Sequence, residues 1–409
     1  MDTIKQKDCL SVNPYPLLPL YPHFTAIKDL SFRVYFGLEQ QEHRLLHNLN
    51  QKNMIHIKKR QSWLNIFAIL FSFTTFMSCV KREETTYNPP IFPTHTHLKV
   101  TDLNHDYLFR YAYRTVVYDS LLIVATLDER HYICIFNRYT GELITEFGKK
   151  GNGPTELITP TEYSIDKAKG ILYVNDYGKQ GILCYDLNKI GTDKMSFIDR
   201  IKYKHKFRQK NNILFLKDSL FISSDDSCHF IIADSHTIRQ EINSEIPDEE
   251  KFPMQKDWNV FMNDYACHAV SPDGTKYVVG SMFGGIMETF EMTNGQMKHS
   301  ATKLFYKPLF MRKGHVYRDV KNTIGGFSYI AVTDSYIYAT VHGTVNPQCM
   351  PTQIWKLDWH GNPIECFHCN GFPIDCFTIV EDENIIYAIC TDQDGEQYIA
   401  KMEFEHDTN

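Results

Sequence analysis

Two short segments carry side chains of the types that most often bind metal ions. CFHC contributes Cys366, His368 and Cys369, and THTHL contributes His95 and His97. A tetrahedral zinc site needs four ligands, which neither segment supplies by itself. Residues three apart on a strand point to opposite faces, so the two thiols are expected to diverge. The two histidines share a face but have no carboxylate or third histidine nearby in the sequence. We therefore predict no metal site and no cofactor.

Two loops contain the residue types of phosphate and calcium sites: GKKGNGP (148–154) and DQDGE (392–396). In the first, backbone N–H groups and two lysines would cradle a phosphate, but the spacing differs from GxxxxGK[ST] and no helix is expected to follow. The second lacks the ligand spacing and the closing glutamate of a calcium loop. We interpret both as tight turns. The chain also has no GxSxG, HExxH or Asp-box motif.

The segment from Lys58 to Cys79 has the order of an export signal. A cationic run (58–60) precedes a largely apolar segment (63–77), and Ser78 and Cys79 follow. The apolar segment is shorter than the roughly 20 residues that a membrane-spanning helix needs. The order therefore predicts a secretory signal rather than a transmembrane span. The ending FMSC resembles a bacterial lipobox, which implies that Cys79 is acylated and becomes the mature N-terminus.

Met54 lies where such a signal would begin, which suggests a division of the chain into four parts. Residues 1–53 are predicted to be a mis-assigned leader or disordered, and residues 54–78 a lipoprotein signal peptide. Residues 79–95 would be a lipid-anchored tether, rich in Thr and Pro, and residues 96–409 the folded domain. Alternatively, the leader is a short cytoplasmic tail on a signal-anchored protein.

Composition excludes one class of partner. The chain has a formal charge of -6, with 43 basic and 49 acidic residues. Nine basic and five acidic residues precede Cys79, which leaves 34 against 44 and a net charge of -10 for the rest. Nucleic-acid binding needs clustered basic charge, so no nucleic-acid partner is expected. Several of the cysteines lie inside apolar runs, where a free thiol behaves as a small hydrophobic residue.

Short apolar runs recur through the rest of the chain, each introduced by an acidic or glycine-containing turn. They begin at Asp119, Lys169, Asp218, Asp273, Asp334 and Glu383, at spacings of 50, 49, 55, 61 and 49 residues. A second short run follows each one, as YICIFN follows DSLLIV. Periods of about 40–50 residues built from short strands are typical of a β-propeller, in which neighbouring blades cover both faces of each sheet. Six repeats predict an all-β, six-bladed propeller.

The last repeat is one strand short. It offers three strand candidates before the chain ends at Asn409. The segment from Thr96 to Leu103 precedes the first complete repeat, and we expect it to hydrogen-bond to the sheet that contains Tyr398 to Phe404. Closure by an N-terminal strand would remove exposed sheet edges.

Two segments resemble known propeller repeats. EFGKKGNGPTELITPTEYSID (146–166) resembles the NHL-type repeat through Phe147, Gly148, Gly151, Gly153, Pro154 and Pro160, and HAVSPDGTKYVV (268–279) resembles the strand pair of TolB-like propellers. With the signal and the six repeats, the chain resembles the TolB-like six-bladed propeller lipoproteins of Gram-negative bacteria. The resemblance implies a fold and a place in the cell envelope, and no defined activity.

One segment differs from the acidic background, KLFYKPLFMRKGHVYRDVK (303–321), and it accounts for the longest spacing between repeats. It contains six Lys or Arg residues and one acid, with aromatic residues between them. Long propeller loops project from one face, where ligands bind, and cationic and aromatic groups suit an anionic or glycan-bearing partner. The predicted partner-binding residues are Lys303, Phe305, Tyr306, Lys307, Arg312, Lys313, Tyr317 and Arg318. Alternatively, the aromatic side chains pack in a blade and the cations are only solvated. A second insertion, residues 249–265, is a further candidate for the same rim.

Two functions of different classes fit these features. The first is a monomeric propeller, lipid-anchored in the envelope at the outer membrane, that binds or scaffolds a protein, peptide or glycan partner. The alternative is an envelope hydrolase or lactonase-like enzyme with carboxylates, with or without a metal, in the central channel. Propeller folds carry both functions, so the fold alone does not decide between them.

Overall fold

The computed structural model describes residues 87–192, 196–203, 213–225, 228–243, 262, 266–313, 315–345, 347 and 350–404. Cys79, the predicted leader and signal, and most of the second insertion lie outside the described residues. Within the described residues, no helix is long and apolar enough to span a membrane. All the elements below belong to the unit Thr85–Asn409.

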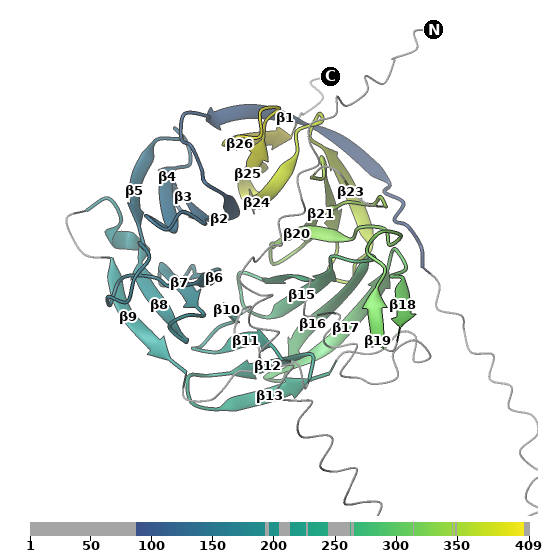
Figure 1. Cartoon of the computed structure of the whole chain (residues 1–409), viewed down its shortest axis with the longest axis horizontal. Helices are drawn as coiled ribbons and strands as arrows, with labels where there is room; N and C mark the ends of the chain where they lie inside the picture. Colours follow the sequence, from purple (N-terminus) through teal and green to yellow (C-terminus); the bar gives the residue numbers. More distant parts are fainter. Residues whose placement is uncertain are drawn as a thin grey trace, which may run out of the picture. The chain divides into compact units, whose positions relative to one another are not determined.

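Six four-stranded blades form a propeller; four of them are separate sheets, and blades 5 and 6 are joined through β1 into one eight-stranded sheet. Figure 1 shows them around a common centre, with first strands such as β2, β6 and β20 innermost and β5, β9 and β13 at the rim. Blade 1 consists of β2 (Ala112–Tyr118), β3 (Leu121–Thr126), β4 (Ile133–Asn137) and β5 (Leu143–Phe147). Blade 2 consists of β6 (Pro160–Asp166), β7 (Ile171–Asp176), β8 (Gly181–Asp186) and β9 (Phe197–Lys202), with the 3-10 helix η1 (Leu187–Lys189) after β8. Blade 3 consists of β10 (Ile213–Phe215), β11 (Phe221–Ser224), β12 (Phe230–Ala233) and β13 (Ile238–Ile242).

The second half of the ring follows the same plan. Blade 4 consists of β14 (Ala266–Val270), β15 (Lys276–Ser281), β16 (Ile286–Thr293) and β17 (Gln296–Leu304). Blade 5 consists of β20 (Phe327–Val332), β21 (Ile337–Val341), β22 (Gln353–Leu357) and β23 (Pro363–His368). Blade 6 consists of β24 (Ile374–Val380), β25 (Ile385–Thr391), β26 (Gln397–Phe404) and the N-terminal strand β1 (Thr94–Asn104), with η2 (Glu381–Glu383) after β24. A two-stranded hairpin, β18 (Phe310–Lys313) and β19 (His315–Arg318), lies between blades 4 and 5 in the sequence.

The repeated apolar runs form the middle strands of the blades. The first run of each repeat is the second strand (β3, β7, β11, β15, β21, β25), and the following run is the third. The described residues form six buried hydrophobic clusters, one at each interface between neighbouring blades. Middle strands are therefore apolar on both faces, because each face lies against the next blade. The prediction of an all-β, six-bladed propeller is confirmed.

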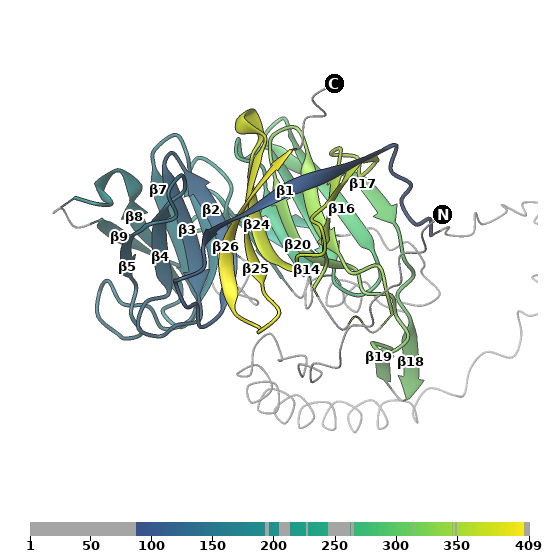
Figure 2. The same ribbon diagram turned by 90° about the horizontal axis from the view of Figure 1, so that it is seen from above.

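Strand β1 closes the ring and also reaches the neighbouring blade. Its residues from Leu98 to Asn104 pair antiparallel with β26, so that Leu98 lies opposite Phe404, which confirms the expected closure. Its first four residues, Thr94 to His97, pair in parallel with β23 of blade 5 instead. Figures 1 and 2 show β1 running along the outside of both blades. All of β1 thus belongs to the sheet that contains Tyr398 to Phe404, as expected, and the contact of its first residues with blade 5 is an addition that the sequence did not indicate.

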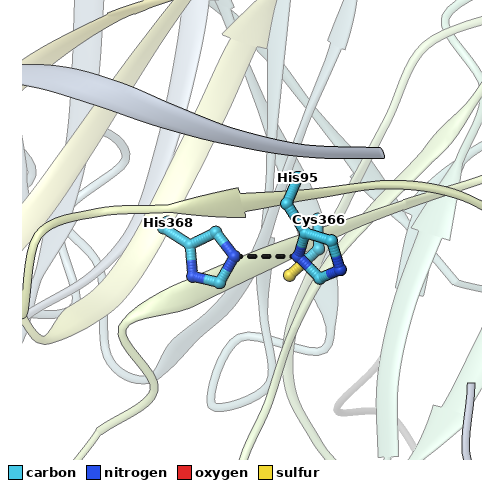
Figure 3. A group of neighbouring side chains, drawn as sticks. All are labelled: His95, Cys366 and His368. Carbon is cyan, nitrogen blue, oxygen red and sulfur yellow. Dashed lines mark hydrogen bonds between the residues drawn. The ribbon is translucent and has the colours of Figure 1, made fainter. Parts of the chain in front are cut away.

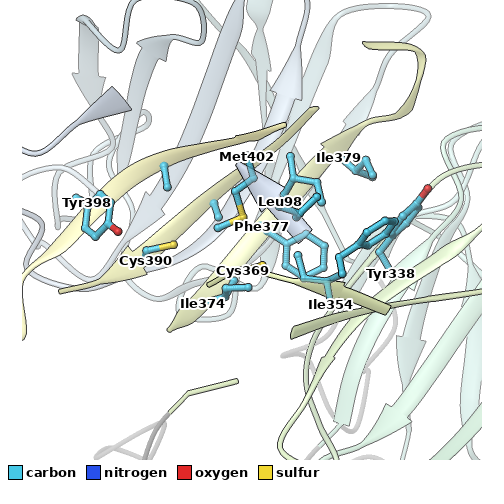
Figure 4. Close-up of a cluster of buried hydrophobic side chains, with 14 residues drawn as sticks. Leu98, Tyr338, Ile354, Cys369, Ile374, Phe377, Ile379, Cys390, Tyr398 and Met402 are labelled. Carbon is cyan, nitrogen blue, oxygen red and sulfur yellow. The ribbon is translucent and has the colours of Figure 1, made fainter. Parts of the chain in front are cut away.

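Leu98 marks the point where β1 passes from one blade to the other. Its side chain is fully buried in the cluster between blades 5 and 6. Figure 4 shows it among Ile354 of blade 5 and Phe377 and Met402 of blade 6. One side chain of the closing strand thus contacts the cores of both blades that the strand joins.

We expect Leu98→Ala to lower the free energy of unfolding by about 2–5 kcal/mol, because removing a buried leucine side chain leaves a cavity. Lys99→Ala, at an exposed position of the same strand, should change it by less than about 0.5 kcal/mol. Urea denaturation of both variants measures the difference. Equal stabilities would show that the packing of this strand does not hold the ring together.

Candidate functional site

An ion pair links the innermost strands of blades 1 and 2, which are neighbours in the ring. Arg114 on β2 lies with Nη2 2.6 Å from Oε2 of Glu162 on β6. The Arg114 guanidinium carbon is also 5.9 Å from the centre of the Tyr329 ring on β20. Arg114 therefore contacts side chains of blades 2 and 5 from blade 1. The axis of the propeller holds a neutralised charge pair at this level.

Burial dominates the electrostatics of this pair. The pKa of Glu162 is raised to about 7 by burial, although the nearby Arg114 acts to lower it. A second inner-strand carboxyl, Asp375 on β24, also has its pKa raised by burial and accepts hydrogen bonds from Thr391 Oγ1 (2.6 Å) and Gln397 Nε2 (3.0 Å). Both carboxyls thus interact with side chains of the protein itself, Glu162 with Arg114 and Asp375 with Thr391 and Gln397.

The basic segment 303–321 forms the hairpin β18–β19 and the strand end before it. The hairpin is a sheet of its own and adds to no blade. Its backbone pairs Phe310 with Arg318 and Lys313 with His315. Figure 2 shows the hairpin projecting from one face of the ring. Its base is fixed where Asp319 N donates to Leu309 O at 2.8 Å.

The predicted partner-binding residues occupy different places. Lys303 donates to Asn362 Oδ1 of blade 5 at 2.8 Å, and Lys307 lies 6.0 Å from the centre of the Tyr87 ring. Phe305 is buried between blades 4 and 5, and Tyr306 lies at the edge of the same cluster. The remaining four belong to the hairpin, and their side chains lie outside the described part of the chain: Arg312, Lys313, Tyr317 and Arg318.

The two loops with ligand-binding residue types are closed by their own acids. In the glycine-rich loop, the Glu156 carboxylate accepts from Gly153 N at 2.7 Å and lies 3.2 Å from Lys149 Nζ. A Cβ added to Gly151 would come within 2.0 Å of that carboxylate, so Glu156 fills the place where a phosphate would bind. In the second loop, Asp392 accepts from the backbone N–H of Glu396 at 2.9 Å. Both segments form the tight turns expected of them.

The two histidine-containing segments meet at the junction of β1 and β23. The parallel register places His95 opposite Cys366 and His97 opposite His368. Nδ1 of His95 lies 2.9 Å from Nε2 of His368, and the donor atoms of His95, Cys366 and His368 all lie within 4.8 Å of one another. Figure 3 shows the His95 and His368 rings facing each other with the sulfur of Cys366 beside them. The sequence showed no third histidine near His95 and His97. The fold supplies one, His368, from β23.

Burial sets the protonation of this cluster. The pKa of His368 is lowered, first by burial and then by the neighbouring His95 and His97. Burial raises the pKa of the Cys366 thiol to about 11. Cys369 lies in the cluster between blades 5 and 6, whereas Cys366 faces blade 4, so the two thiols diverge as expected.

A second group of similar composition lies in blade 1. His131 Nε2 is 3.1 Å from Glu146 Oε2, and Cys134 is the third member. The hydroxyl of Tyr107 donates to the Glu146 carboxylate and lies 3.2 Å from Cys134 Sγ. Tyr107 therefore occupies the space between the cysteine and the carboxylate.

The fold and the arrangement of its strands define a closed six-bladed β-propeller. The chain belongs to the TolB-like 6-blade propeller-like family, which matches residues 91–382.

Solved structures are similar to this chain at low sequence identity. A protein of Bacteroides fragilis described as exported is 13% identical, covers 76% of this chain and 99% of its own, and has a TM-score of 0.50. A member of the DUF4221 family from Bacteroides vulgatus is 11% identical, covers 75% of this chain and 96% of its own, and has a TM-score of 0.47. No curated protein matches the sequence.

The raised pKa of Glu162 gives a testable pH dependence. The folded protein keeps this proton to a higher pH than the unfolded chain does, so stability is lost as the pH rises from about 4.5 to about 7. The free energy of unfolding of the wild type, relative to Glu162→Gln, should fall by roughly 2–4 kcal/mol across this window, at about 1.4 kcal/mol per pKa unit.

Urea denaturation at a series of pH values measures the difference. Glu142→Gln, in an exposed turn of blade 1, controls for the loss of one charge. If the difference in unfolding free energy between the wild type and Glu162→Gln is the same at every pH, the pKa of Glu162 is not raised in the folded protein.

Proposed function

We propose that this propeller is an exported, lipid-anchored binding module of the cell envelope that docks an anionic protein, peptide or glycan partner on the hairpin β18–β19. The observation that carries the proposal is the hairpin itself. It projects from the ring, and it contributes no strand to any blade (Figure 2). The six blades are complete without the hairpin, so the fold alone does not account for it.

Charge complementarity supports an anionic partner. Segment 303–321 contains six Lys or Arg residues and one acid, whereas the chain from Cys79 onward has a net charge of -10. A cationic projection on an anionic body attracts an anionic partner to that site and repels it elsewhere. Because Phe305 is buried in the core between blades 4 and 5, its ring does not face a partner, and the cations carry the proposed contact.

The envelope location is supported by the order of residues from Lys58 to Cys79. Acylation of Cys79 would attach the protein to a membrane, and the outer membrane is the destination we propose. The hydrolase alternative would use free carboxylates in the channel. The axial carboxylate Glu162 is instead paired with Arg114.

Replacing Lys307, Arg312 and Lys313 together by Ala should weaken partner binding by roughly 10–100-fold at low salt, because each exposed charge pair contributes up to about 1 kcal/mol. The affinity of the wild type should itself fall as salt is added, since exposed charges are screened. The partner is recovered by pull-down from envelope extracts and then titrated at low and high salt.

A second triple variant provides the matched control. Lys99, Lys167 and Lys298 are exposed on other parts of the ring, and changing them to Ala alters the net charge equally. The melting temperature should be unchanged in both variants. Equal affinities for the two triple variants would remove the hairpin cations from the binding site.

Mass spectrometry of the protein purified from membranes should find Cys79 as an acylated N-terminal residue. Lipidation is expected because a basic run, an apolar segment and Ser78 precede the cysteine in the order of a lipoprotein signal. Cys79→Ser should release the protein from the membrane fraction. An unmodified Cys79 thiol, or peptides from residues 1–53 in the mature protein, would contradict the proposal.

A further inference from the structure

We propose that His95, Cys366 and His368 form a binding site for a divalent transition metal ion of the Zn²⁺ class, with His97 beside them as a fourth donor. This site is independent of the proposed partner-binding hairpin. It lies on the outer side of the ring, where β1 meets β23.

The donor atoms already have the spacing that such an ion requires. With Zn–N of about 2.0–2.1 Å and Zn–S of about 2.3 Å, tetrahedral ligand atoms lie about 3.3–3.6 Å apart. The two ring nitrogens are 2.9 Å apart, and the three donor atoms lie within 4.8 Å of one another. If the donor atoms move by a few tenths of an ångström to about an ångström, all three can therefore coordinate one ion.

The backbone holds these residues in a two-by-two arrangement. His95 and His97 alternate on β1, Cys366 and His368 alternate on β23, and the parallel register pairs them directly. The four side chains consequently share one face of the two-stranded ribbon. The His97 ring stacks on His368 at 5.1 Å between ring centres, which places it next to the three donors.

Neighbouring groups orient the donors. Nδ1 of His97 lies 3.2 Å from Asn370 Oδ1. In the tautomer in which Nδ1–H donates to this oxygen, the lone pair of His97 is on Nε2, which is how metal-binding histidines are usually oriented. Sγ of Cys366 lies 3.6 Å from Oε1 of Gln353 on β22. Asn370 also ties the cluster to the closing strand, because its Nδ2 donates to Leu98 O at 3.0 Å.

The donor set selects the kind of ion. One thiolate and two or three imidazoles suit Zn²⁺ and Co²⁺ and do not suit Mg²⁺ or Ca²⁺, which prefer oxygen ligands. When the ion binds, the Cys366 S–H bond breaks, a metal–sulfur bond forms and the proton passes to solvent.

Metal binding here would cross-link the closing strand to blade 5. His95 lies on β1, whereas Cys366 and His368 lie on β23. An ion held by both strands binds the closed ring and not the unfolded chain, so it raises the thermal unfolding midpoint. The second cluster, His131 with Cys134 and Glu146, lies within blade 1, so an ion there would not connect the closing strand to blade 5.

Cobalt titration of the full chain, reduced and freed of metal by chelation, tests the site. Co²⁺ bound to a thiolate gives a charge-transfer absorption in the near ultraviolet, which histidine and carboxylate ligands do not give. We expect this band in the wild type and its loss in Cys366→Ser. Each of the two clusters has one cysteine, so Cys134→Ser is the matched control and should keep the band.

A second variant keeps the test valid where the buried Cys366 cannot be changed without unfolding. His95 is exposed, and His95→Gln should weaken Co²⁺ binding at least tenfold and abolish the metal-dependent rise in the unfolding midpoint. His105→Gln, an exposed histidine that pairs with Asp102 and Asp392, should change neither.

Three results would overturn the proposal: no thiolate band in the wild type, a band that survives in folded Cys366→Ser, and unchanged affinity in His95→Gln. Loss of the band in Cys134→Ser alone would assign the ion to the blade 1 cluster instead.

Discussion

The pairing of β1 with two blades at once is the interaction on which the rest of the structure depends. Each blade buries its apolar faces only because another blade lies on either side, so the ring has to be closed. Blade 6 draws three strands from the C-terminal end of the chain and its fourth from the N-terminal end. The same strand continues onto blade 5 and buries Leu98 between the two. Backbone hydrogen bonds and one apolar side chain therefore hold the ring at the same junction.

Side chains complete the closure where the backbone does not. Gln397 on β26 accepts from Ala112 N at 2.6 Å and donates to Ala112 O at 3.0 Å, which joins blade 6 to blade 1. Arg114 pairs with Glu162 and so joins the innermost strands of blades 1 and 2. Because these contacts fix the first strands, the protein keeps a rigid body from which the β18–β19 hairpin projects. A binding function on such a scaffold requires little change in the ring itself.

The repeat pattern was sufficient to predict the blades, since apolar runs with a regular spacing follow directly from burial on both faces. The closing strand was also predictable, because the last repeat lacked one strand. The pairing of His97 with His368 was not, since residues 271 apart in the chain are brought together by the few residues of β1 that extend past blade 6. Local spacing around His95 and Cys366 contains no sign of this contact. Likewise, the glycines at 151 and 153 indicated a turn, but only the fold shows that Glu156 fills it.

The closing strand also determines the order in which this protein can fold. Leu98 pairs with Phe404, so the part of β1 from Leu98 to Asn104 has no partner until β26 has been synthesised. Contacts between residues so far apart slow folding, because the loop that they close is long. Until then this part of β1 is an unpaired strand, and its free backbone groups are prone to pair with other chains. A chaperone that shields β1 until β26 is available would therefore raise the yield of folded protein.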